Sequence, residues 1–261
     1  MKRKRHSLFA ILWLGAWLLV TYGSNAAETG VVPPDRELFL QGRFIFERNC
    51  ATCHGKWGDG KGDMSAGMLP RPRSFVSGLF KYHSTPAGFL PTNEDLMRTI
   101  REGIPSTAMP SFTILSEKEI HAVAEYIKTF SSKWRKKENY APPLQLPPLP
   151  AWFERRQALQ THATTGHDLF QQLCAACHGL KGDGQGPSAA QLKDQWEQRC
   201  PPSDLRQSAL RSGRQFTDIY RVLMTGISAT PMPSFADSLS DKQRWDLIAY
   251  IAELRREFHP D

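Results

Sequence analysis

The chain has 261 residues, which is too long for one small core and suits two domains of ordinary size. Its formal net charge is +7 at pH 7, but the first 26 residues contain four basic and no acidic side chains, which leaves about +3 for the rest. Such a weak positive charge does not indicate binding to nucleic acids, and an exported protein would not meet them. A weakly basic face could still guide an acidic protein partner.

The first 26 residues have the pattern of a secretory signal peptide. A basic start is followed by an apolar run from Leu8 to Val20 and then by small and polar residues, with a predicted cleavage site after Ala26. The run is shorter than the ~20 residues that a membrane-spanning helix needs, so an uncleaved anchor is the weaker alternative. We therefore expect a periplasmic protein, and no second apolar run predicts a membrane span in the mature chain.

The rest of the chain contains one pattern twice. The stretch "CATCHGKWGDGKG" begins at Cys50, and "CAACHGLKGDGQG" begins 124 residues later at Cys174. The first copy carries an extra "FKYHSTPAGFLP" and the second a longer "QLKDQWEQRC", while the flanking residues repeat. This repetition predicts domain 1 at residues 36–137 and domain 2 at residues 153–261. Residues 138–152, which contain five prolines, form the predicted extended linker.

Each predicted domain begins and ends with a helical pattern. In "RELFLQGRFIFERNC", Leu38, Gly42 and Phe46 share one face at four-residue spacing. In "LSEKEIHAVAEYIKTF", Ser116 and Glu119 form the pattern of a capping box, and the second copy repeats the plan. The intervening sequence is rich in Gly and Pro and lacks the alternation of strands. We expect two small all-α domains, with too few large apolar residues to fill their cores unaided.

Four of the five cysteines lie in two C-x-x-C-H motifs, which is the attachment sequence of c-type haem. The two thiols of such a motif can form thioethers with the haem vinyl groups, and the next residue can place an imidazole on the iron. The motifs predict two covalently attached haem c groups. The attachment residues are Cys50, Cys53, Cys174 and Cys177, and the iron ligands are His54 and His178.

Two other interpretations of the cysteines are weaker. A thioredoxin-like dithiol requires a βαβ setting, which the pattern lacks. A zinc site would require both motifs to pack together and would leave the two histidines unexplained. The fifth cysteine, Cys200, is expected to be buried and inert. Arg71 and Arg73 could meet haem propionates, although solvated arginines are an equally good interpretation.

From residue 36 to residue 255, the chain resembles the class I c-type cytochromes in a tandem dihaem arrangement. In that family, a Gly and an aromatic residue on the first helix cross the last helix. Gly42 with Phe46 and Gly166 with Phe170 fall at these positions. The resemblance therefore implies two tandem cytochrome c-like helical domains joined by the Pro-rich linker.

The family's sixth iron ligand is a Met in a Pro-flanked loop before the last helix. The resemblance assigns this role to Met109 in "STAMPSF" and to Met232 in "ATPMPSF". A thioether is a soft, neutral ligand that favours reduced iron. The rival ligands are His83, His162 and His167, none of which recurs at an equivalent position.

The family often has a Pro after the motif whose carbonyl accepts the proximal histidine N–H. Pro187 fits this role in the second copy, whereas Asp63 occupies the equivalent position in the first. The acceptor for His54 is therefore left open. A carboxylate at Asp63 would also favour oxidised iron, so we expect the first haem to have the lower potential.

These observations predict an exported dihaem cytochrome that carries single electrons between redox protein partners. It is expected to be an electron carrier rather than an enzyme, because saturated His/Met iron has no open position for a substrate. One alternative is a haem subunit fixed to a dehydrogenase or reductase. Another is a dihaem peroxidase-like enzyme, which the presence of Met in both copies disfavours. The sequence does not separate a free shuttle from a bound subunit.

Overall fold

The computed structural model describes residues 35–255, so the predicted signal peptide lies outside the described residues. Helices form nearly all the regular structure in this part of the chain. Only two isolated β-bridges accompany them there, one joining Lys193 to Arg199 and one joining Leu210 to Gly213. The all-α prediction is confirmed.

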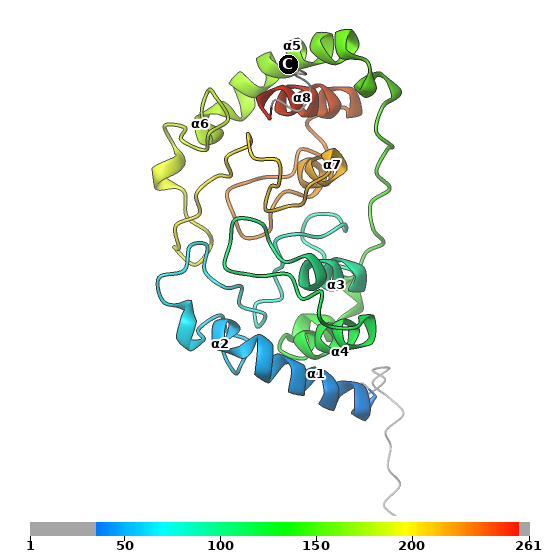
Figure 1. Cartoon of the computed structure of the whole chain (residues 1–261), viewed down its shortest axis with the longest axis vertical. Helices are drawn as coiled ribbons and strands as arrows, with labels where there is room; N and C mark the ends of the chain where they lie inside the picture. Colours follow the sequence, from blue (N-terminus) through cyan, green and yellow to red (C-terminus); the bar gives the residue numbers. More distant parts are fainter. Residues whose placement is uncertain (1–34, 256–261) are drawn as a thin grey trace, which may run out of the picture. The chain divides into compact units, whose positions relative to one another are not determined.

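The first half of the structure, residues 35–137, contains the helices α1 to α4 (Figure 1). Their bounds are α1 (Arg36–Asn49), α2 (Ala51–His54), α3 (Asn93–Glu102) and α4 (Glu117–Lys128). The last helix packs against both α1 and α3. It starts at the predicted capping box, in which Ser116 accepts from the Glu119 N–H and the Glu119 carboxylate accepts from the Ser116 N–H.

The second half, residues 153–255, repeats this plan with α5 to α8. Their bounds are α5 (Arg156–Leu173), α6 (Ala175–His178), α7 (Phe216–Thr225) and α8 (Asp241–Leu254). Here α8 packs against α5 and α7. A capping box of Ser240 and Gln243 begins α8, as Ser116 and Glu119 begin α4.

A glycine lets the first and last helices of each half cross at very short range. A Cβ added to Gly42 would lie 2.1 Å from the Ala122 carbonyl oxygen, and one added to Gly166 would lie 1.9 Å from the Asp246 carbonyl oxygen. The neighbouring aromatic residues Phe46 and Phe170 are fully buried at these crossings. The crossing predicted from the Gly and aromatic positions is confirmed in both halves.

Each half has its own cluster of buried apolar side chains. Phe46 and Ile120 belong to the first cluster, and Phe170, Tyr220 and Ile248 belong to the second. Two separate cores agree with a two-domain, all-α fold. Both halves nevertheless belong to one compact unit of the chain.

The Pro-rich segment lies against the first half. The Leu144 N–H donates to the Ser84 carbonyl at 2.8 Å, and the Leu90 N–H donates to the Asn139 carbonyl at 2.9 Å. Both bonds involve the insertion found only in the first copy. The predicted spacer is therefore paired with the insertion, and the exact domain boundaries stay a prediction.

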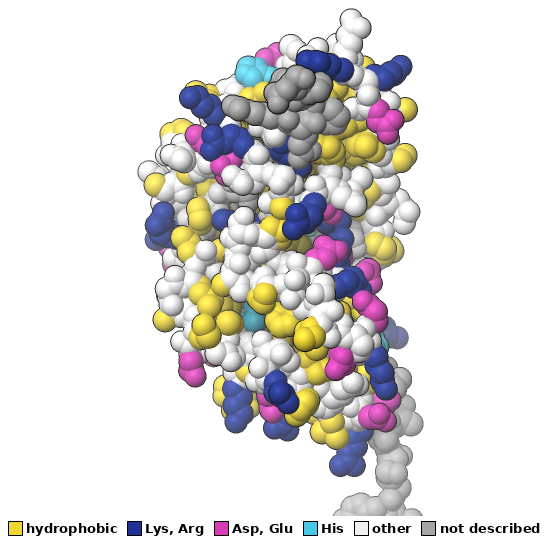
Figure 2. Space-filling model, in the orientation of Figure 1, with side chains coloured by type: hydrophobic (Ala, Val, Ile, Leu, Met, Phe, Trp, Pro, Cys, Tyr) yellow, Lys and Arg dark blue, Asp and Glu magenta, His cyan; other side chains and the backbone are white. Residues whose placement is uncertain are grey.

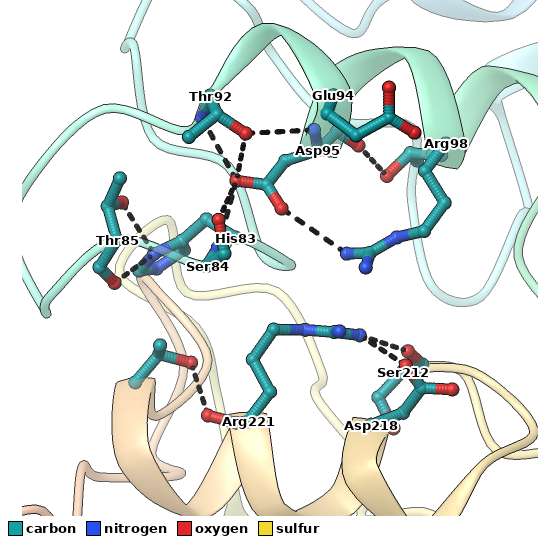
Figure 3. Close-up of polar contacts among 12 residues, drawn as sticks. His83, Ser84, Thr85, Thr92, Glu94, Asp95, Arg98, Ser212, Asp218 and Arg221 are labelled. Carbon is teal, nitrogen blue, oxygen red and sulfur yellow. Dashed lines mark hydrogen bonds and ion pairs between the residues drawn. The ribbon is translucent and has the colours of Figure 1, made fainter. Parts of the chain in front are cut away.

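Polar side chains of both halves gather where α3 and α7 face each other (Figure 3). Asp95 and Arg98 form an ion pair at 3.4 Å on α3, and the equivalent Asp218 and Arg221 form one at 2.7 Å on α7. Beside them, His83 is buried, and its Nδ1 donates to the Thr85 carbonyl at 2.9 Å.

The other ring nitrogen of His83 connects the two halves directly. In the neutral ring, whose Nδ1 donates to Thr85, Nε2 accepts from the Ser228 hydroxyl at 3.0 Å. Burial is the main cause that lowers the pKa of His83, and the hydrogen bond that its ring donates to the Thr85 carbonyl acts in the opposite direction. The folded state therefore favours the uncharged ring.

We expect acid to destabilise the fold partly through His83. Because its folded-state pKa is lowered, the unfolded chain takes up this proton first as the pH falls below about 6.5. The free energy of unfolding at pH 5 and pH 8 should therefore differ less in His83→Gln than in the wild type. The half-exposed His167 provides the control, because His167→Gln should keep the wild-type difference. Equal pH dependence in His83→Gln and the wild type would contradict this role.

Candidate haem sites

Each cysteine motif forms the turn that follows a long helix. In the first half, the Cys50 N–H closes α1 by donating to Phe46, and the His54 N–H donates to the Cys50 carbonyl at 2.9 Å. The second half repeats this geometry, with the His178 N–H donating to the Cys174 carbonyl at 2.8 Å. This single turn directs both cysteines and the histidine of each motif toward one cavity.

The two cavities contain the predicted site residues of their own halves. The first has a volume of about 160 Å³ and the second about 190 Å³. The first is lined by Cys50, Cys53, His54 and Met109, and the second by Cys174, Cys177, His178 and Met232. The fold thus brings together all eight residues in two sets of four.

The two motif histidines have equivalent backbone partners. His54 Nδ1 donates to the Arg73 carbonyl at 3.0 Å, and His178 Nδ1 donates to the Ser203 carbonyl at 3.2 Å. Each acceptor directly follows a proline in the sequence. This bond fixes the ring and leaves Nε2 available to a metal.

The expected acceptor in the second half was wrong. Pro187 is exposed, and Ser203 takes the role assigned to it. The carbonyl that accepts this bond belongs to a loop that returns to the motif from far along the chain. Asp63 is also exposed, so solvent screens its carboxylate and weakens the argument for a lower potential in the first half.

Burial sets the protonation of the motif residues. It lowers the pKa of His54 and His178, which keeps each imidazole neutral and able to donate an electron pair. Burial also raises the pKa of Cys50 to about 12 and that of Cys174 to about 11. The cavity walls are therefore uncharged at the first thiol and at the imidazole of each motif.

The repeated Gly-Asp-Gly folds a loop back under the motif. In the first half, the Gly60 N–H donates to the His54 carbonyl at 2.8 Å, and Asp59 Oδ1 accepts from the Lys61 N–H at 3.0 Å. The same bonds join Gly184 to His178 at 2.8 Å and Asp183 to Gln185 at 3.0 Å. The fixed interval between the motif and these residues is thus a structural requirement of the loop.

Both methionines are held by the same local bonds. The Met109 N–H donates to Thr107 Oγ1 at 3.1 Å, and the Met232 N–H donates to Thr230 Oγ1 at 3.3 Å. The carbonyl of each methionine accepts from an isoleucine N–H, at 3.1 Å from Ile104 and 3.0 Å from Ile227. The equivalent loops therefore present one thioether to each cavity.

The rival histidine ligands have other partners. Both ring nitrogens of His83 are hydrogen-bonded, to Thr85 and Ser228. His162 binds Asp246 at 2.5 Å and stacks on Trp152, while His167 is half-exposed beside Asp168. These contacts favour the methionines over the histidines.

The structure also bears on the remaining cysteine interpretations. All five cysteines are described, and none forms a disulfide. Within residues 35–255, no group of three His, Cys, Asp or Glu side chains is placed to hold a metal ion, which counts against the zinc site. Cys200 is partly buried and lines the second cavity.

Three further residues line both cavities and were missed from the sequence. They are Lys81 and Tyr82 of the first half and Arg211 of the second. Burial lowers the pKa of Lys81 to about 8, with a smaller effect of the same sign from nearby Arg73. Their only sequence signal is that Lys81 and Tyr82 lie in the insertion of the first copy.

The cavities suit a haem because their walls contain possible iron ligands and apolar side chains, and because one buried polar atom has no hydrogen-bond partner. An apolar macrocycle suits walls made of residues such as Leu96, Ile100 and Leu223. The Nε atom of Arg73 is buried and has no hydrogen-bond partner, and Arg73 lines the first cavity. A buried guanidinium in this state matches the carboxylates that a haem carries.

Two stretches of the chain, residues 37–127 and 161–251, match the sequence profile of the family described as cytochrome c oxidase, cbb3-type, subunit III. The chain belongs to this family of c-type cytochromes. The tandem resemblance read from the motifs is therefore confirmed. As a c-type cytochrome it is an electron-transfer protein with covalently bound haem c, and it is not an enzyme.

The cytochrome is similar to proteins from several bacteria along both halves. The cytochrome bc1 complex cytochrome c subunit of Corynebacterium efficiens is 25% identical, over 94% of this chain and 73% of the relative. The Mycobacterium leprae protein of that name is 23% identical, over 89% of this chain and 68% of the relative. A chain in the solved structure of the Kuenenia stuttgartiensis reducing HAO-like protein complex is 36% identical with a TM-score of 0.76, covering 82% of this chain and 95% of that chain.

Among residues 35–255, no helix of the cytochrome is both long and apolar enough to cross a membrane. The longest of them, α5, has 18 residues and carries polar side chains along its length.

Proposed function

We propose that this cytochrome carries two haem c groups and passes single electrons between protein partners outside the cytoplasmic membrane. The observation that carries the proposal is the presence of the complete set of two cysteines, one histidine and one methionine in each of two cavities. Cys50 and Cys53 would attach one haem, and Cys174 and Cys177 the other. When bound, each haem supplies the one-electron chemistry of its iron.

The residues of the chain have defined tasks in this proposal. His54 and His178 would bind iron through Nε2, and the carbonyls of Arg73 and Ser203 hold their rings in place. Met109 and Met232 would provide the sixth ligand and raise the potential. Because one histidine and one methionine would hold each iron, the bound haem would supply electron exchange with protein partners and would not need to bind a substrate.

Mass spectrometry of the exported protein tests the number of haems. We expect the mass of the chain cleaved after Ala26 plus two haem masses, retained after extraction with acidic acetone. The double variant Cys50→Ala with Cys53→Ala should lose one haem mass. As a matched control, Cys200→Ala should keep both, because Cys200 lies outside the motifs. One haem or none in the wild type would overturn the proposal.

A fixed position in a larger complex is the second candidate. The relatives from Corynebacterium efficiens and Mycobacterium leprae are named as complex subunits, and the similar solved chain belongs to a protein complex. On the face shown in Figure 2, Lys and Arg side chains are scattered and do not form one basic patch that would identify a docking site for a shuttle. Purification from its native source would separate the two candidates, because a subunit copurifies in fixed stoichiometry and a shuttle does not.

A further inference from the structure

The two cavities share part of their walls. Lys81 and Tyr82 belong to the first half and line the second cavity as well as their own. Arg211 belongs to the second half and lines the first cavity as well as its own. The cavities therefore meet at these three side chains, two of which are cations.

Positive charge at this meeting point exceeds the negative charge near it. Arg73, Lys81 and Arg211 are all partly or largely shielded from solvent, and they influence one another electrostatically. Asp194 is the carboxylate that acts on both Lys81 and Arg73. The Arg73 guanidinium also lies over the Trp196 ring, 4.7 Å from its centroid. Because pairing offsets the cost of burying cations, additional anions would stabilise this region.

The hydrogen bonds of the cations leave donors available. Arg211 Nη1 donates to the Pro201 carbonyl at 3.1 Å, which anchors the side chain by one edge. The Arg73 Nε atom is buried without a hydrogen-bond partner. No ion pair joins Arg73, Lys81 or Arg211 to a carboxylate in the part of the chain that the structure describes.

We propose that Lys81 and Arg211 form a shared binding site for the propionate carboxylates of both haems, so that each cation sets the potential of the haem in the other half as well as its own. This proposal rests on the proposed function, since it requires two haems. Haem propionates are carboxylates on the edge of an otherwise apolar macrocycle. They match cations that line apolar cavities, and Arg can bind them in bidentate fashion.

A shared cation has a specific electrostatic consequence. Reduced haem carries one less positive charge than oxidised haem, so a nearby cation favours reduction and raises the potential. Removing a cation that faces both haems must therefore lower both potentials. Removing one that faces a single cavity must lower mainly one.

Redox titration of charge variants tests the sharing. Arg211→Gln and Lys81→Gln should each shift both midpoint potentials downward. Arg73→Gln should shift mainly the first, because Arg73 lines only that cavity. The potentials are assigned to the halves with Met109→Ala, which changes the iron environment of the first haem alone. Arg214→Gln is the matched control, since Arg214 is exposed in the same loop as Arg211 and should shift neither.

Each outcome of these titrations either supports or contradicts the shared propionate site. A shift confined to the half that contains the substituted residue, or no shift, would overturn the sharing while the haem count still supports the proposed function. If a variant matures without its full haem content, loss from both halves supports the sharing and loss from its own half alone contradicts it. Arg211→Lys keeps the charge and should retain both potentials. A wild type with fewer than two haems would refute the proposed function itself.

Discussion

Replacing Met109 by Ala is expected to remove about half of the weak far-red charge-transfer band of the oxidised protein, and Met232→Ala about half as well. Each cavity is lined by one thioether in addition to its motif histidine. A soft sulfur ligand favours reduced iron, so each substitution should also lower the potential of its own haem. Absorbance spectra and redox titrations of both single variants and the double variant measure these effects.

An exposed methionine of the first half supplies the control. Met64 is 58% exposed, and Met64→Ala should leave both the band and the potentials unchanged. If the band survives both cavity substitutions, sulfur is not the ligand. His83 and His167 would then become candidates again, and the hydrogen bonds of His83 to Thr85 and Ser228 would have to break first.

Adding one methyl group at Gly166 is expected to destabilise the second half by about 1–3 kcal/mol, as overpacking in a tight core does. The new Cβ would lie 1.9 Å from the Asp246 carbonyl oxygen, and a backbone atom cannot rotate away as a side chain can. Helix propensity favours Ala over Gly by about 1 kcal/mol, so the steric cost must exceed this gain. Chemical denaturation of Gly166→Ala and of the equivalent Gly42→Ala measures the effect.

The control for this prediction lies on the same helix. Thr161 is exposed on α5, and Thr161→Ala should be neutral or slightly stabilising. Haem incorporation should fall in the half that carries the Gly substitution and stay complete in the other. A Gly166→Ala protein as stable as the wild type would show that α5 and α8 can separate at no cost.

Most of the candidate site could be predicted because its chemistry depends on side-chain type and spacing. The cysteines and His54 lie within five residues of one another, so one helical turn determines their geometry. The resemblance to class I cytochromes pointed to Met109, and its surroundings recur around Met232. The same resemblance pointed to Gly42, where close helix contact requires a missing Cβ.

The features that could not be predicted depend on contacts between distant segments. The acceptors for the motif histidines are backbone carbonyls, which every residue has, so no residue type marks Arg73 or Ser203. Pro187 was expected because the family often has an accepting Pro after the motif, whereas the acceptor here, Ser203, lies in a separate loop. The role of Lys81 and Arg211 follows from how the halves pack together, and neither copy of the repeat contains that information alone.

The linker also makes contacts with a distant segment that the sequence pattern did not predict. Its prolines predicted an extended spacer, and residues 140–150 indeed form no helix. The pattern did not show that Leu144 pairs with Ser84 in the insertion. Two departures from the repeat, the insertion and the linker, thus support each other in the structure, although they lie far apart in the sequence.

The shared cavity walls determine whether the two halves of this chain can be treated as independent domains. A fragment ending before the linker would lack Arg211, and a fragment starting after it would lack Lys81 and Tyr82. Each fragment would keep its own helices and motif but lose part of the wall around its cavity. We therefore expect that neither copy forms a complete cavity wall when it is grafted alone onto another protein, and that a substitution at Lys81 or Arg211 affects the cavities of both halves.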